Sequence, residues 1–442
     1  MSVTLPTSLP TQKSAVENHR WFQNLIARIE SSDVICSLLA VFDQGMISGT
    51  NFVTAILIGR CCGAETLGIY SLVAAAIAMT VGVQDQLITA PYVLYHNRKK
   101  HRSLKRYAGS VLLHQFVFSA LISIGVAVCL FAGAASSSTA QMVTLILLIA
   151  APGILLRAFI REVALAHYDV MTVVLVDAVV CVCQLAVVGG LFAVEALNLA
   201  TVYCVLGAAC VVTAAVWMKY NRGRFVFDRE ATSVSWTRNW RFGRWALATH
   251  LAGTSTPYIM PWVLFALRGD RETGLLASCS VIVGIANILL SGLGDFLTPR
   301  AASAYASGGI KQLRKILRSM LGLSVIAIGS VVAVSALFGE QIIDVLYNGR
   351  FAGTGTMVTV MSLAVLANAF GNVAGNGLWA LDRPRANFVA DMLTLVVAIS
   401  TAPMLIGPYG ALGAAGSTLA ASAFGAFFRQ LIFMQAAAEK AQ

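Results

Sequence analysis

Twelve apolar segments alternate with polar gaps along the chain, and each segment is long enough to cross a lipid bilayer as a helix. A hydrocarbon core of about 30 Å requires roughly 20 helical residues. The pattern therefore predicts an all-α integral membrane protein. Its predicted spans are residues 34–58, 68–92, 108–133, 141–165, 170–194, 198–218, 244–267, 274–298, 317–338, 355–380, 386–406 and 409–434.

Basic residues are distributed unequally between the two sides of this predicted membrane. Of the 31 Lys and Arg residues, 27 lie in the terminal tails, in the gaps after even-numbered spans or in the span halves that adjoin them. The gaps after odd-numbered spans hold only Arg60, Arg268, Arg271 and Arg350. Because Lys and Arg collect in cytoplasmic loops, we expect a multi-pass protein with both termini in the cytoplasm.

Composition agrees with a membrane protein and excludes other classes. The chain is 58% hydrophobic and 12% charged, with a mean hydropathy of +0.77, which a soluble protein could not bury. The net charge of +11 is spread over short gaps rather than concentrated in one basic domain. Membrane lipids, and not nucleic acid, are therefore the expected partners of this charge.

The spans divide the chain into five predicted regions. They are a cytoplasmic tail at 1–33, an N-terminal six-helix lobe at 34–218, a basic cytoplasmic linker at 219–243, a C-terminal six-helix lobe at 244–434 and a cytoplasmic tail at 435–442. Apolar residues at helical spacing in 19–30 favour a helix in the membrane interface, with a short disordered tail as the alternative. The linker combines six basic residues with Trp236 and Trp240, which indicates a segment lying on anionic headgroups.

The two lobes repeat one another at a nearly constant offset. The residues after the first span that recur after the seventh are Arg60, Glu65, Thr66 and Gly68, which correspond to Arg268, Glu272, Thr273 and Gly274. Six spans per lobe is an even number, so the two lobes have the same orientation in the membrane. Parallel repeats predict two six-helix lobes around a central cavity, moving by rocking, which favours a transporter.

Two stretches of the chain resemble a known family. Residues 42–52 (FDQGMISGTNF), followed by Arg60, Gly63, Glu65, Gly68 and Tyr70, resemble the first helix and loop of bacterial polysaccharide exporters. Residues 338–347 (FGEQIIDVLY) resemble the loop after the ninth helix of the same family. These exporters belong to the multidrug/oligosaccharidyl-lipid/polysaccharide flippase superfamily, whose twelve spans in two lobes match the whole chain.

The resemblance implies a flippase of the bacterial inner membrane that moves undecaprenyl-diphosphate-linked oligosaccharide by alternating access, for polysaccharide biosynthesis. It also implies coupling to H⁺ or Na⁺, and proteins of polysaccharide assembly as candidate partners. The chain has no phosphate-binding loop, metal-ligand cluster or Ser-His-Asp arrangement. We therefore expect a secondary carrier with no catalytic residue, metal or cofactor, and not an enzyme.

Four ionisable residues inside the predicted spans are the leading candidates for chemistry, because charge within a membrane is costly. Arg157 and Arg161 lie four residues apart on one helix face, and guanidinium groups match phosphate oxygens, so they are candidate ligands of the diphosphate. Asp43 and Asp85 lie at similar depths on consecutive helices, and together are the candidate site for the coupling cation. The alternative for each is structural pairing: Arg157 and Arg161 with Asp177 and Glu162, Asp43 with a hydrogen-bond donor or an Arg, and Asp85 with a partner that the sequence does not specify.

Two stripes of neutral polar residues are candidate sugar-binding surfaces, since amides and hydroxyls bond sugar hydroxyls. Small and amide residues also hold membrane helices together, and this alternative stays open. The stripes consist of Gln44, Ser48 and Asn51 on the first span and Asn368, Asn372 and Asn376 on the tenth.

The seventh span contains Pro257 and Pro261, which each remove a backbone hydrogen bond. They predict a bend, and therefore a hinge, in this span. His250, one turn earlier, is interpreted as a packing histidine rather than a proton carrier.

Two other functions compete with the flippase. A multidrug antiporter of the same superfamily, coupled to a cation, would require a mainly acidic cavity, whereas Arg157 and Arg161 suit a diphosphate. A membrane glycosyltransferase or polymerase would require a large external loop, and the predicted external gaps are short. The glycan, the coupling ion and the oligomeric state cannot be inferred from these patterns.

Overall fold

The computed structural model describes residues 33–96, 101–132 and 137–440, and these residues form helices and connecting turns without a β-strand. The helix expected at residues 19–30 lies outside the described residues. The N-terminal elements are α2 (Asp33–Gln84), η1 (Asp85–Thr89), α3 (Ala90–His96), α4 (His101–Phe131), α5 (Ser138–Ala166), α6 (Val170–Ala193), α7 (Leu199–Asn221) and η2 (Arg222–Arg224). The later elements are α8 (Arg229–Arg268), α9 (Asp270–Tyr347), α10 (Gly355–Ala380) and α11 (Pro384–Glu439).

Eight helices in the described residues are long and apolar enough to span a membrane, and α8 is not among them. Three of the eight, α2, α9 and α11, each cross twice, which gives eleven crossings, and the second half of α8 adds the twelfth. The backbone departs from helical geometry at Gly63 in α2, at Gly308 and Gly309 in α9 and at Gly410 in α11. Gly63, Gly309 and Gly410 have positive φ angles, which glycine adopts without strain, so the helix can reverse direction there. The prediction of an all-α protein with twelve transmembrane helices is confirmed.

Short polar side chains mark the starts of several helices. Ser137, Asp169 and Asn198 each accept a hydrogen bond from a backbone N–H in the first turn of the helix that follows. Asp228 does the same for α8, accepting from the N–H groups of two residues. These caps satisfy backbone donors that have no partner within the helix.

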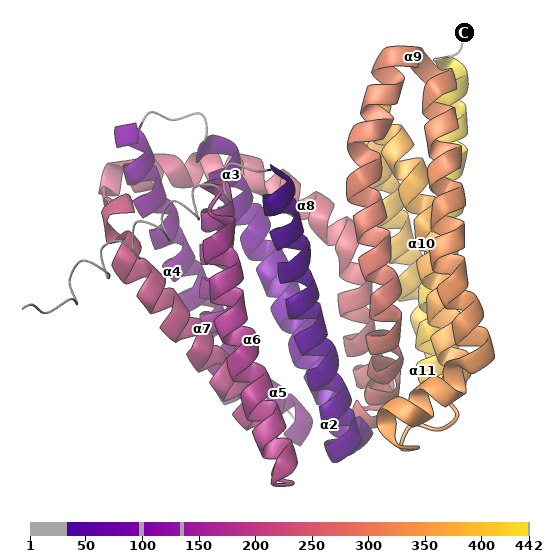
Figure 1. Cartoon of the computed structure of the whole chain (residues 1–442), viewed down its shortest axis with the longest axis horizontal. Helices are drawn as coiled ribbons and strands as arrows, with labels where there is room; N and C mark the ends of the chain where they lie inside the picture. Colours follow the sequence, from indigo (N-terminus) through magenta and orange to yellow (C-terminus); the bar gives the residue numbers. More distant parts are fainter. Residues whose placement is uncertain (1–32, 97–100, 133–136, 441–442) are drawn as a thin grey trace, which may run out of the picture.

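The helices form two lobes that meet at one end and diverge at the other. Figure 1 shows α2 to α7 in one lobe, and α9 to α11 with the second half of α8 in the other. The lobes converge where residues 58–70, 268–276, 345–355 and 405–411 lie, and we call this the closed end. We call the opposite end, with residues 86–96, 217–243 and 300–315, the basic end.

The buried apolar residues follow the same division. One core cluster contains residues of both lobes, including Ile58 and Leu67 of α2 with Ile343 and Tyr347 of α9. Two further clusters lie nearer the basic end, one formed only by residues 87–225 and the other only by residues 297–437. The lobes therefore share a core at the closed end and have separate cores towards the basic end.

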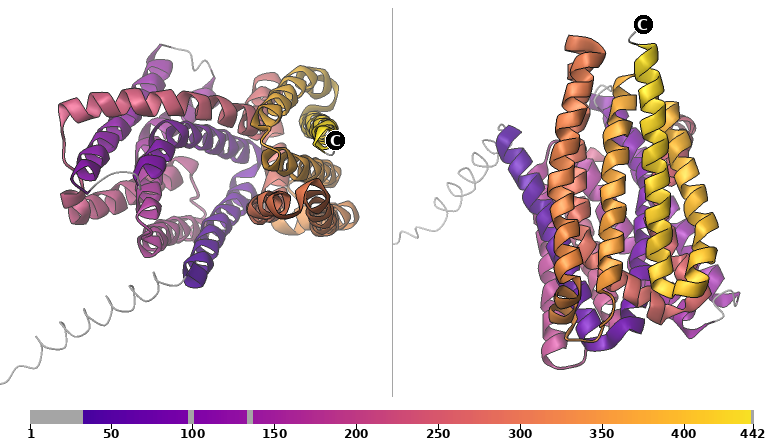
Figure 2. Two further views of the ribbon diagram at one scale, coloured as in Figure 1. Left: turned by 90° about the horizontal axis from the view of Figure 1, so that it is seen from above. Right: turned by 90° about the vertical axis from the view of Figure 1, so that its right-hand side faces the viewer.

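The linker between the lobes is a helix rather than a loop. The first half of α8 lies across the basic end, and its second half turns into the C-terminal lobe (Figures 1 and 2). At the turn, a side chain on Gly243 would lie 2.8 Å from the carbonyl oxygen of Gln86, so the two backbones need a glycine to approach this closely. Pro257 and Pro261 lie further along α8, which is not interrupted there. The hinge at these prolines remains a prediction.

Candidate functional site

A cluster of ion pairs lies within the N-terminal lobe, between α2, α5 and α6. Arg157 contacts Asp177 through Nε and Nη2, both 2.7 Å from Oδ1 of the carboxylate. Arg161 places its Nη2 2.5 Å from Asp43 Oδ2, and its Nε 3.1 Å from Asp177 Oδ2. The second of these distances is an ion pair without hydrogen-bond geometry. Asp177 thus links two guanidinium groups that project from one face of α5.

The side chains of this cluster differ in burial, so one side of the cluster is accessible and the other is not. The side chain of Asp177 is fully buried and that of Asp43 is 2% exposed, whereas that of Arg161 is 29% exposed. The carboxylates therefore lie behind the guanidinium of Arg161, which faces the accessible side. Because a buried charge is costly without a partner, this pairing stabilises both Asp side chains in an apolar surrounding.

Two further carboxylates, those of Asp85 and Glu162, lie near Arg161. Asp85 begins the π-helical turn η1, and its Oδ1 accepts a hydrogen bond from Thr89 at 3.1 Å. Asp85, Glu162 and Arg161 interact electrostatically with one another. Single π-helical turns in membrane and soluble helices are frequent at functional sites. Four carboxylates and two guanidinium groups therefore share one region of the N-terminal lobe.

This region reaches the other lobe through His250 of α8. A side chain on Gly82 of α2 would lie 2.3 Å from His250 Nε2, so the imidazole packs directly on the α2 backbone. His250 also interacts electrostatically with Asp85. The packing role expected for His250 fits these contacts, and its neighbour is the carboxylate of Asp85.

We expected Asp43 and Asp85 to lie together, but the structure pairs Asp43 with other residues. The carboxylate near Asp43 is Asp177, and both carboxylates contact the same edge of the Arg161 guanidinium, through Nη2 and Nε. Hydropathy gave the depth of each group in the membrane but not its rotation about the helix axis, and rotation decides which groups meet. The structure thus places Arg157, Arg161 and Asp43 in one cluster, with Asp85 beside it.

The polar stripe of the first span is largely exposed. Gln44 and Asn51 are exposed and Ser48 is half-buried. In the part of the chain that the structure describes, no hydrogen bond of these three side chains is recorded. They are therefore available to an external ligand, and their role in sugar binding remains a prediction.

The stripe of the tenth span is partly used within its own lobe. Asn376 accepts a hydrogen bond from Thr298 of α9 at 2.6 Å and donates one to the carbonyl oxygen of Asn372 at 2.9 Å. Asn372 is exposed and Asn368 is half-buried. Asn376 thus joins α9 to α10, as the alternative interpretation of this stripe expected, while Asn372 remains accessible.

The C-terminal lobe contains an ion pair that the sequence interpretation missed. Arg429 donates from Nη2 to Oδ1 of Asp391, and both belong to α11 on either side of its bend. Gly253 of α8 and Gly371 of α10 pack against this pair. The sequence places both residues in the cytoplasmic halves of their predicted spans, but it does not show that the bend in α11 brings them together.

The closed end is held by contacts between the lobes. Arg60 of α2 donates to the carbonyl oxygens of Leu346 and Val345, the second at 2.5 Å from Nη2. Arg350 donates in the reverse direction, to the carbonyl oxygen of Cys61 at 2.9 Å. These are two of the four basic residues that break the charge asymmetry of the chain. Their position in predicted external gaps, where basic residues are rare, was the signal in the sequence that could have identified Arg60 and Arg350.

Glycines related by the internal repeat bring the helices of the two lobes together at the same place. A side chain on Gly68 would lie 2.1 Å from the carbonyl oxygen of Asp270. A side chain on Gly274 would lie 1.8 Å from the carbonyl oxygen of Ala64. The contact is therefore backbone against backbone, and it follows the pseudo-symmetry of the repeat.

In the described residues, no group of three or more His, Cys, Asp or Glu side chains is arranged to hold a metal ion.

No protein-family model matches the sequence, and no curated protein matches it. Solved structures do share its fold.

An inward-facing structure of a multidrug resistance MATE family transporter of the MOP superfamily is similar over 90% of this chain and 95% of its own, with a TM-score of 0.73 and 14% identity. The lipid II flippase MurJ, in an inward closed conformation, is similar over 92% of this chain and 91% of its own, with a TM-score of 0.72 and 13% identity. An outward-facing MATE structure of the same superfamily has a TM-score of 0.60 at 14% identity, over 94% of this chain and 98% of its own. The chain therefore has the fold of these two-lobed membrane transporters.

Proposed function

We propose that this protein is a transporter that works by alternating access, with the basic end in the cytoplasm and the closed end outside. The distribution of Lys and Arg supports this orientation. A shared core at one end and separate cores at the other support an inward-facing state. The higher TM-score against the inward-facing MATE structure than against the outward-facing one agrees with that assignment.

The substrate that we propose is a lipid-linked oligosaccharide, carried by undecaprenyl diphosphate across the bacterial inner membrane for polysaccharide biosynthesis. The observation that carries this proposal is the accessible guanidinium of Arg161, fixed from behind by two buried carboxylates. A fixed guanidinium can present its remaining N–H groups to diphosphate oxygens at little cost in side-chain order. The exposed amides of Gln44 and Asn51 on α2 would then meet the sugars.

Coupling to H⁺ or Na⁺ is supported by the charge balance of the same region. Asp43, Asp177, Asp85 and Glu162 carry up to four negative charges, and Arg157 and Arg161 carry two positive ones. Unbalanced charge in a low-dielectric region is costly, so protons or a metal cation would balance the excess. Asp43 and Asp85 remain our candidates for the residues that bind this cation.

The same excess of carboxylates favours one rival function, a multidrug antiporter. An organic cation could take the place of the coupling cation beside Asp85 and Glu162. This rival predicts that cationic dyes are exported and that lipid-linked glycans are not affected.

Deletion of the gene, followed by complementation, separates the two functions. We expect lipid-linked oligosaccharide to accumulate in the inner leaflet of the deletion strain and to return to normal when the wild-type gene is restored. Arg161→Ala should fail to restore it, whereas Arg314→Ala, which removes an exposed Arg of α9, should succeed at equal protein level. Unchanged lipid-linked oligosaccharide together with new sensitivity to cationic dyes would refute the flippase and support the antiporter.

A further inference from the structure

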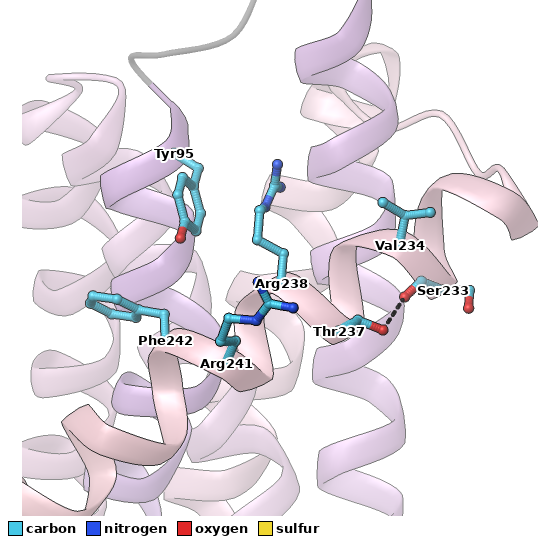
Figure 3. A pocket seen from close by; sticks show the side chains of 7 residues that line it. All are labelled: Tyr95, Ser233, Val234, Thr237, Arg238, Arg241 and Phe242. Carbon is cyan, nitrogen blue, oxygen red and sulfur yellow. Dashed lines mark hydrogen bonds between the residues drawn. The ribbon is translucent and has the colours of Figure 1, made fainter.

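A pocket at the basic end contains two arginines and lies outside the transport site. Its volume is about 650 Å³, and its walls are Tyr95 of α3 with Ser233, Val234, Thr237, Arg238, Arg241 and Phe242 of α8. Figure 3 shows Tyr95, Arg238, Arg241 and Phe242 gathered at one side of it, with Val234 and Ser233 at the other. No carboxylate is among the described residues that line the pocket. Its charge therefore favours an anion.

Arg238 is held in a way that leaves part of its guanidinium unsatisfied. Its carbon Cζ lies 4.5 Å from the ring centre of Tyr95 and 4.8 Å from that of Tyr107, so two aromatic rings fix its position. The Tyr107 hydroxyl interacts with this guanidinium, but Nε and Nη2 are buried and neither makes a hydrogen bond of good geometry to the described residues. A buried donor without a partner is destabilising, and a ligand that accepts both bonds removes that penalty.

The two unsatisfied nitrogens also specify the shape of the acceptor. The N–H bonds of Nε and Nη2 point in the same direction from the planar guanidinium, so they match two oxygens of one phosphate or carboxylate. Arg241 lies one turn along α8 and is exposed, close enough on the helix surface to share the same anion.

The surroundings of the pocket indicate that the anion belongs to a lipid. The first half of α8 lies across the end of the helix bundle (Figure 2), where a membrane surface would run. Trp236 and Trp240 on this segment are 46% and 45% exposed, and their rings stack with centres 6.1 Å apart. Exposed tryptophans are typical of segments at the membrane interface, where the ring lies at headgroup level.

We propose that this pocket is a binding site for the phosphate diester of an anionic glycerophospholipid, bound as a resident lipid and not as the transported substrate. Arg238 binds two phosphate oxygens, Arg241 adds a second charge, and Val234 and Phe242 contact the apolar part of the lipid. Bound there, the lipid connects the first half of α8 to α3. The proposal does not depend on which substrate the transporter carries.

Binding of phosphatidylglycerol and phosphatidylcholine to the purified full-length protein tests the proposal, with native mass spectrometry as the measurement. We expect phosphatidylglycerol to be preferred, and Arg238→Gln to reduce its affinity about tenfold, as for the loss of a charge-assisted pair of bonds. Arg238→Lys keeps the charge but loses the paired geometry, and it should reduce the affinity as well. Arg229→Gln, an exposed position of α8 outside the pocket, is the matched control and should bind like the wild type.

Three results would overturn the proposal. Equal losses for Arg238→Gln and Arg229→Gln would mean that only the general basic surface attracts the lipid. Full binding by Arg238→Lys would show that charge suffices and that no paired site exists. Loss of undecaprenyl-diphosphate binding with normal phosphatidylglycerol binding in Arg238→Gln would assign the pocket to the transported lipid. Circular dichroism of each variant confirms that the helices are retained, so that a binding loss is not a folding loss.

Discussion

Gly274→Ala is the most direct test of how the closed end is held. The new Cβ would lie 1.8 Å from the carbonyl oxygen of Ala64, and real Cβ atoms essentially never approach within 3.0 Å of another heavy atom. The obstructing atoms belong to the backbone of α2, so no side-chain rotation relieves the overlap. The two helices must separate by about 1.2 Å, the difference between these two distances.

The expected effect is a shift of the conformational equilibrium towards a state in which the two lobes are separated at the closed end. Overpacking of this kind typically costs about 1–3 kcal/mol, and each 1.4 kcal/mol is a factor of ten, so the closed population relative to the open one should fall roughly 5- to 150-fold. Gly68→Ala meets the carbonyl oxygen of Asp270 and should act in the same direction. Because Gly68 and Gly274 belong to one contact, the double variant should lose less than the sum of the two single losses.

Electron–electron spin distances across the closed end measure this shift. Labels at Glu65 of α2 and Val345 of α9 occupy exposed positions on opposite lobes, in a chain whose native cysteines have been replaced. Gly274→Ala should move the distribution to longer distances. Gly284→Ala, in the same helix, is the control, because a Cβ there meets no atom within 4 Å. A wild-type distribution for Gly274→Ala would refute the idea that backbone contact at this glycine closes the gate.

Three other perturbations test separate parts of the structure. Arg60→Ala removes two bonds to carbonyl oxygens of the other lobe and should weaken the closed end by about 1–2 kcal/mol in the same spin-label assay; Arg271→Ala, which removes an exposed side chain, should not. Asp43→Asn should abolish the dependence of transport in vesicles on an imposed pH or Na⁺ gradient while leaving substrate binding, and transport that still follows the gradient would exclude Asp43 as the coupling residue. Burial and the nearby His167 and Arg224 lower the pKa of His96 from its ordinary value of 6.5, so the unfolded chain binds that proton more readily. Thermal stability should therefore be full above about pH 6.5 and fall as the pH is lowered, and His96→Gln should reduce this loss in a melting experiment.

Hydropathy predicted the number of crossings and the class of fold because both depend only on local composition. The boundary between the first two spans, residues 59–67, contains Gly63, where the backbone of α2 turns. The linker was not recognised as a helix, because its alternation of Trp and Arg was interpreted as lipid contact without a defined secondary structure. In the structure, the Asp228 cap and the packing of Gly243 against Gln86 define where that helix begins and where it bends.

The candidate site could be predicted only as a set of residues at similar depth. Arg161, Asp43 and Asp177 lie on three different helices, and their meeting depends on how each helix is rotated and packed. A single sequence contains little information about rotation when a span is apolar on every side. The Asp391–Arg429 pair shows the same limit, since the two residues are 38 positions apart and meet only because α11 bends at Gly410.

Contacts within the lobes differ in kind from contacts between the lobes. This difference explains how the lobes could move without exposing unpaired charge. In the described residues, the ion pairs within the membrane lie inside one lobe: Arg157 and Arg161 with their carboxylates in the N-terminal lobe, and Arg429 with Asp391 in the C-terminal lobe. Breaking a buried ion pair costs roughly 3–5 kcal/mol, so pairs that stay within a lobe favour rigid lobes. The contacts across the closed end are of another type, glycine against backbone and Arg60 and Arg350 to carbonyl oxygens, whose groups water can solvate when the lobes part. A rocking motion would therefore break contacts between the lobes that need little free energy to separate, and it would keep the ion pairs within each lobe, which need more.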